Sequence, residues 1–94
     1  MNVKVDKRCK FEIYFDILNS LHSELNKYDN VSPTRVAYNA RMPYDRFQKR
    51  LGKLIQLGMV SRVGDRFVVT EKGLEYMTDF KKMLDSFYVN AHPK

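Results

Sequence analysis

The chain has 94 residues, is 44% hydrophobic and contains six Phe and six Tyr, enough for one small core but not for a second domain. No apolar run approaches the roughly 18 residues that cross a bilayer. The charged N-terminus MNVKVDKRCK lacks the apolar segment of a secretory signal, and a single cysteine excludes an internal disulfide. We therefore expect one domain over residues 1–94, located in the cytoplasm without a membrane partner.

The net charge of +6 is distributed unevenly along the chain. The segment Pro33–Arg66 holds eight basic and two acidic residues, so it carries the whole excess, while the rest of the chain is neutral. Because a positive surface on a neutral body attracts polyanions, this distribution predicts a nucleic-acid partner.

The first predicted element is a helix over about 7–27. Apolar residues recur there every three or four positions, at Phe11, Tyr14, Phe15, Leu18, Leu21 and Leu25. The turn signal YDN follows, and then a short extended piece at Val31. Ser32 before Pro33 is typical of an N-cap followed by the first helical position, so a second, short helix is expected over 33–39.

A third helix is predicted over 43–57. Ala40-Arg41-Met42 interrupts the preceding pattern, Pro43 suits a helix start, and Gly58 is expected to end the helix as a left-handed cap. The apolar residues fall within about 100° of arc and predict a packed face, formed by Tyr44, Phe47, Leu51, Leu54 and Ile55. The basic residues Arg46, Lys49 and Lys53 lie opposite, with Arg50 at the edge.

The last third of the chain predicts a hairpin and a helix. Two β-prone runs flank Gly64-Asp65, a spacing typical of a two-residue hairpin turn over 60–70, with Arg62 and Arg66 beside the tip. Thr70 is expected to cap a final helix over 71–88. Its apolar stripe consists of Leu74, Met77, Phe80, Leu84, Phe87 and Tyr88.

The order helix, short strand, helix, helix, β-hairpin, helix predicts an α+β, mostly α fold, the winged helix-turn-helix. In this arrangement the second helix of the pair, here 43–57, enters the major groove of DNA. The hairpin, here 60–70, forms the wing on the DNA backbone. The basic face of the third helix would then meet phosphates and base edges.

Two segments, TRVAYNARMPYDRFQKRLGKLIQLGMV and FVVTEKGLEYM, resemble the small archaeal winged helix-turn-helix DNA-binding proteins, which include ArnR-like regulators and small dimeric chromatin-type proteins. The resemblance covers about residues 10–84. It is carried by Thr34, Arg35, Tyr38, Pro43, Tyr44, Leu57, Gly58, Met59, Val60, Thr70, Lys72 and Gly73. It implies a transcription regulator or nucleoid-associated protein. It also implies a homodimer through the C-terminal helix, so the apolar stripe over 71–88 is the expected dimer interface.

The main DNA contacts are predicted on the third helix. Arg46 lies near the N-terminus of that helix and suits a bidentate contact with guanine, whereas Lys49 and Lys53 suit phosphates. A merely solvated basic face is the alternative. The rings of Tyr38 and Tyr44 are expected to pack between helices. The complete set of predicted DNA-binding residues is Thr34, Arg35, Arg41, Tyr44, Arg46, Gln48, Lys49, Arg50, Lys53, Arg62 and Arg66.

No catalytic, metal or cofactor site is predicted, and no small-molecule ligand is expected. Cys9 and His22 would lie about 20 Å apart along the first helix, so that helix cannot join them in a catalytic pair. Two His and one Cys do not make a four-ligand zinc site. The alternative function is a winged-helix module for protein or RNA contacts without sequence-specific DNA binding, because one fold serves many functions. Such a module would more often expose apolar residues on the third helix.

Overall fold

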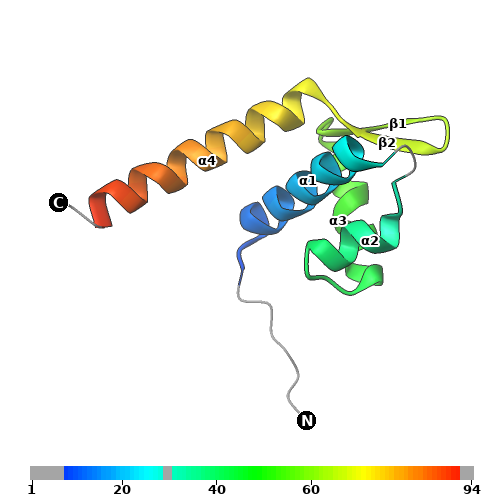
Figure 1. Cartoon of the computed structure of the whole chain (residues 1–94), viewed down its shortest axis with the longest axis horizontal. Coiled ribbons are helices and arrows are strands. Elements are labelled where there is room, and N and C mark those ends of the chain that lie inside the picture. Colours follow the sequence, from blue (N-terminus) through cyan, green and yellow to red (C-terminus); the bar gives the residue numbers. More distant parts are fainter. Residues whose placement is uncertain (1–7, 29–30, 92–94) are drawn as a thin grey trace, which may run out of the picture.

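The computed structural model describes residues 8–28 and 31–91, and within α4 it describes side chains as far as Phe87. The described elements are α1 (Lys10–Lys27), α2 (Pro33–Asn39), α3 (Tyr44–Gln56), β1 (Val60–Val63), β2 (Arg66–Val69) and α4 (Glu71–Ala91) (Figure 1). This order confirms the predicted winged helix-turn-helix fold. The predicted short strand at Val31 is wrong. Val31 packs its side chain against the core but pairs with neither strand of the two-stranded sheet.

The core lies where α1, α2 and α3 meet. Its most enclosed side chains come from all three helices and from the first strand, namely Ile17, Leu18, Val36, Phe47, Leu54 and Val60. Burying an aliphatic or aromatic side chain of this size stabilises the fold by about 1.5–3 kcal/mol. The three helices therefore form one body, and Val60 attaches the wing to it.

Hydrogen bonds at the helix ends fix the helix-turn-helix. The Ser32 hydroxyl accepts from the Arg35 amide at 3.3 Å, which confirms the predicted N-cap of α2. Gly58 has φ 80° and ends α3, and the Met59 amide donates to the Leu54 carbonyl at 2.9 Å. This is the predicted left-handed cap, in the form of a Schellman motif.

The turn between α2 and α3 uses the same motif without glycine. Arg41 occupies the left-handed position with φ 59°, and the Met42 amide donates to the Ala37 carbonyl at 3.0 Å. A side chain in this conformation costs about 1–2 kcal/mol because its Cβ crowds the carbonyl oxygen. The turn is therefore strained at Arg41.

The wing is a tight antiparallel hairpin. Val63 pairs with Arg66, so Gly64 and Asp65 form a two-residue turn, and Gly64 has the positive φ of 62° that such turns require. The predicted hairpin is confirmed.

The segment Thr70-Glu71-Lys72-Gly73 attaches α4 to the end of α3. The Gly73 amide donates to the Thr70 hydroxyl at 3.1 Å, and that hydroxyl donates to the Gly58 carbonyl at 2.6 Å. A Cβ at position 73 would overlap the Met59 carbonyl and come within 2.8 Å of the Val69 side chain. Glycine is therefore required at this close approach, and Thr70 caps α4 as predicted.

Only the first part of α4 packs on the body. The Phe80 ring stacks on Phe15 with 4.8 Å between centroids, and the Tyr76 hydroxyl donates to the Phe11 carbonyl. Burial raises the pKa of Tyr76 to about 12, so the hydroxyl keeps its proton at neutral pH. Beyond Phe80 the helix extends away from the other elements (Figure 1).

Candidate nucleic-acid interface

The inner face of α3 is narrower than its sequence predicts. Phe47, Leu51 and Leu54 are buried as expected. Tyr44 and Ile55, predicted for the same face, are 43% and 37% exposed, so this part of the prediction is wrong. The two residues lie at the edge of the apolar arc, and α1, α2 and β1 cover only its centre.

The outer face of α3 carries unneutralised positive charge. Arg46, Lys49 and Lys53 are exposed, and their spacing of three and four residues places them side by side. Within residues 8–28 and 31–91, no carboxylate lies at salt-bridge distance from any of the three. The guanidinium of half-buried Arg50 instead lies over the Tyr14 ring at 5.7 Å. The repulsion among the three exposed cations is therefore not relieved inside the described chain.

Arg35 on α2 has a different environment. It forms a salt bridge with Glu24, a buried residue of α1. The other carboxylate oxygen of Glu24 accepts a hydrogen bond from the side-chain amide of Asn39 at 3.2 Å. The Arg35 guanidinium also lies 4.3 Å from the centroid of the Tyr28 ring. The hydrogen bond to Glu24 raises the pKa of Arg35, which therefore stays charged. This residue, predicted among the DNA-binding residues, joins α2 to α1.

Glu24 is a structural residue that was not predicted from the sequence. A signal was present, because Glu24 follows Leu21 by three residues and Ile17 by seven, which places a carboxylate on the apolar face of α1. A buried carboxylate requires a partner. Arg35 and Asn39, four residues apart on α2, supply it.

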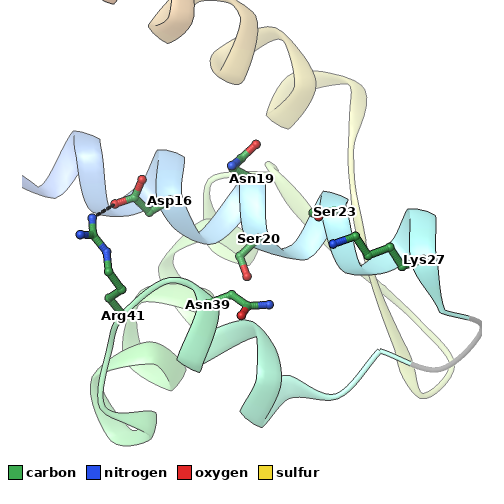
Figure 2. A pocket seen from close by; sticks show the side chains of 7 residues that line it. All are labelled: Asp16, Asn19, Ser20, Ser23, Lys27, Asn39 and Arg41. Carbon is green, nitrogen blue, oxygen red and sulfur yellow. Dashed lines mark ion pairs between the residues drawn. The ribbon is translucent and has the colours of Figure 1, made fainter.

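Arg41 lies at one end of a polar hollow of about 330 Å³ between α1 and α2 (Figure 2). Its guanidinium is 3.7 Å from the Asp16 carboxylate, which also accepts from Arg8 at 2.7 Å. Lys27 lies at the other end of the hollow. The full lining is Asp16, Asn19, Ser20, Ser23, Lys27, Asn39 and Arg41. The lining holds two cations and one acid, so its net charge is smaller than that of α3, which has four cations and one acid.

Tyr38 lies on the surface. The buried residues of α2 and its C-cap are Val36, Ala37 and Ala40, and Tyr38 points away from them with 80% of its surface exposed. The expectation that this ring packs between helices is therefore wrong. Thr34, one turn earlier, is exposed as well.

Both arginines of the wing are exposed. The Arg62 guanidinium lies 5.5 Å from the centroid of the Phe67 ring, and its Nε donates to the Gly64 carbonyl at 3.3 Å. These contacts hold Arg62 beside the turn, while Arg66 follows the turn on the other strand.

The predicted dimer residues of α4 fall into two groups. Met77 and Phe80 are buried against the core of their own chain, whereas Leu74, Leu84 and Phe87 are 39%, 40% and 67% exposed. Tyr88 lies outside the described side chains. Met83, which is not among the predicted dimer residues, is also exposed.

The described helices include none that is long and apolar enough to cross a membrane. In the same residues, no group of three or more His, Cys, Asp or Glu side chains is arranged to hold a metal ion.

Comparisons with known proteins identify the same fold. Residues 7–87 match the model of a family described as winged helix-turn-helix. The chain is 30% identical over 82 residues to the uncharacterized protein MJ0287 of Methanocaldococcus jannaschii, covering 87% of this chain and 72% of that protein. It is 31% identical to a solved structure, that of Sso10a-2, a DNA-binding protein from Sulfolobus solfataricus. That match covers 89% of this chain and 90% of the other, with a TM-score of 0.60. The chain belongs to the winged helix-turn-helix family and is similar to small archaeal proteins of this fold.

Proposed function

We propose that this chain binds double-stranded DNA, with α3 in the major groove and the wing on the DNA backbone. The observation that carries the proposal is the row of exposed cations on α3, Arg46, Lys49 and Lys53, which have no carboxylate partner in the described chain. Phosphates would neutralise this row and release counterions, which favours binding. The similarity to Sso10a-2, a DNA-binding protein, supports the same function.

The remaining contacts follow from this orientation. Exposed Arg62 and Arg66 on the wing would reach the backbone beside the groove that α3 occupies. Exposed Thr34 in the first turn of α2 would contact a phosphate with its hydroxyl. Arg35 would contribute less, because its guanidinium is already paired with Glu24. A protein with these contacts acts as a transcription regulator or as a nucleoid-associated protein, and not as an enzyme.

The proposed binding unit is a homodimer formed through α4. The face of α4 that packs on α1 through Phe80 continues in Met83, Leu84 and Phe87, three, four and seven residues later, all of which are exposed. A second copy would cover this apolar stripe and remove it from water. Two α3 helices placed about 34 Å apart would fit successive major grooves on one face of DNA.

The dimer is tested by sedimentation of the full chain at roughly tens of micromolar protein, because association depends on protomer concentration. Wild type is expected to sediment as a dimer and Leu84→Glu/Phe87→Glu as a monomer, because charge on the stripe opposes its burial. Thr78→Glu/Lys82→Glu places the same new side chains on the opposite face of α4 and should remain dimeric. A monomeric wild type would contradict the dimer.

DNA binding is tested by titrating wild-type protein onto a random-sequence duplex at two salt concentrations. We expect tight binding at low salt and a steep loss of affinity as salt rises, since phosphate contacts dominate. Absence of binding at about 50 mM salt would contradict the proposed function. The basic face would then point to an acidic protein partner.

A further inference from the structure

Gly52 is in the middle of α3, on the surface of the helix. A Cβ built at this position meets no atom within 4 Å, and the residue is exposed. Its φ is not positive, unlike those of Gly58 and Gly64. Glycine destabilises a helix interior relative to alanine. Neither packing nor backbone conformation in the described chain therefore requires glycine here, and the helix backbone is left open to a close approach from outside.

Gly52 belongs to a neutral strip along one side of α3. Gln48 precedes it by four residues, Tyr44 by eight, and Ile55 follows it by three, so all four lie along one line of the helix surface. Gln48 is exposed, and Tyr44 and Ile55 are partly exposed. The helical pattern of the sequence had predicted Tyr44 and Ile55 on the buried face. The strip therefore combines an amide, two apolar groups and a bare stretch of backbone.

The cations lie on the other side of the exposed surface of α3. Arg46, Lys49 and Lys53 share that side, and Arg50 continues it toward α1, where it meets Tyr14. Asp45, the one acid of α3, lies beside the neutral strip in the first turn, where its carboxylate repels phosphates. The exposed half of α3 is thus divided into a side suited to the DNA backbone and a side unsuited to it.

We propose that α3 turns this neutral strip toward the base edges of A·T pairs in the major groove, with Gly52 at the closest approach of the helix to the DNA. The proposal rests on the DNA binding proposed above and specifies which side of α3 contacts bases. Gln48 donates to adenine N7 and accepts from adenine N6, the bidentate pairing that glutamine makes with this base. Tyr44 and Ile55 contact thymine methyl groups. Lys49 and Lys53 hold the flanking phosphates.

The first test is Gly52→Ala, measured for stability and for affinity on a duplex selected by wild type from a random pool. The fold gains helix propensity, so Tm rises by about 2–8 °C. Affinity falls by about tenfold because the added methyl occupies the space that the DNA needs. The salt dependence of binding stays unchanged because no charge is removed. A stabilised variant with undiminished affinity would overturn the proposal.

The second test uses the same duplex with adenine replaced by 7-deazaadenine, which lacks the N7 acceptor. Wild type should lose about fivefold or more in affinity, whereas Gln48→Ala, already weaker, should bind both duplexes equally. Thr78→Ala, which changes an exposed polar residue of α4, serves as the control and should keep the wild-type sensitivity. A wild type indifferent to the replacement, or a selected pool without A·T enrichment, would also overturn the proposal.

These outcomes are separate from failure of the proposed function. If wild type binds no duplex at low salt, DNA binding itself is wrong. If wild type binds but Gly52→Ala and Gln48→Ala behave as wild type, DNA binding stands and only the base-reading role of the neutral strip is lost.

Discussion

The cations of α2 and of α3 come from one basic segment but have opposite environments. Arg35 on α2 is paired with the buried carboxylate of Glu24 and lies against the Tyr28 ring, although 41% of its side chain stays exposed. Lys49 and Lys53 on α3 have no carboxylate partner in the described chain and are exposed. Charge density along a sequence therefore does not separate cations that hold a fold together from cations that are free to bind a polyanion. The two kinds of cation are distinguished by whether a carboxylate of the folded chain is paired with them.

The largest effect on stability is expected from removing the shared partner on α1. Glu24→Ala should lower the free energy of unfolding by about 2 kcal/mol, because it deletes charge-assisted hydrogen bonds that join α1 to α2. Urea denaturation measures the change. Glu75→Ala, an exposed carboxylate on α4, is the control and should stay within about 0.5 kcal/mol of wild type. Equal losses in the two variants would show that the Glu24 network does not stabilise the fold.

One substitution made in both helices separates the roles of their cations. Arg35→Met should lower the denaturation midpoint, since it leaves Glu24 buried without its cation. Lys49→Met should leave the midpoint near that of wild type, because an exposed unpaired cation contributes little to folding. The effects on DNA affinity should be reversed, with the larger loss in Lys49→Met. If the two variants lose stability equally, the division between the helices is wrong.

A smaller effect is expected at the strained turn between the two helices. Arg41→Gly should be more stable than Arg41→Ala by about 1 kcal/mol, because only glycine adopts the left-handed conformation without cost. Both variants lose the exposed ion pair with Asp16. The difference between their stabilities therefore reports the cost of the left-handed backbone conformation alone. Thermal unfolding of the two variants measures it. An alanine variant as stable as the glycine variant would mean that the turn is not strained.

Sequence patterns predicted the parts of this fold that depend on neighbouring residues. The Ser32-Pro33 start of α2, the Gly58 end of α3 and the Gly64-Asp65 turn each follow from the conformations of one or two residues. The buried residues of α3, Phe47, Leu51 and Leu54, follow from helical periodicity. These features confirm that local rules were sufficient to order the elements.

The features that sequence patterns missed depend on contacts between distant residues. Tyr38 has the same aromatic character as a core residue, but the core beneath α2 is filled by Val36, Ala37 and Ala40. Arg35 meets Glu24 only because α2 packs across α1. The role of each residue depends on which neighbouring helix packs against it. The periodicity of apolar residues within one helix does not contain this information.

If the cations of α3 form the DNA-binding surface, the salt dependence of binding should depend on them and not on cations elsewhere in the chain. The slope of log affinity against log salt is measured on one duplex for wild type, Lys49→Ala/Lys53→Ala and Lys81→Ala/Lys82→Ala. The last pair removes the same charge from exposed positions on α4. We expect the slope to fall by about 2 for the α3 pair and to stay unchanged for the α4 pair. Equal changes in both pairs would contradict the claim, because DNA would then respond to net charge and not to α3.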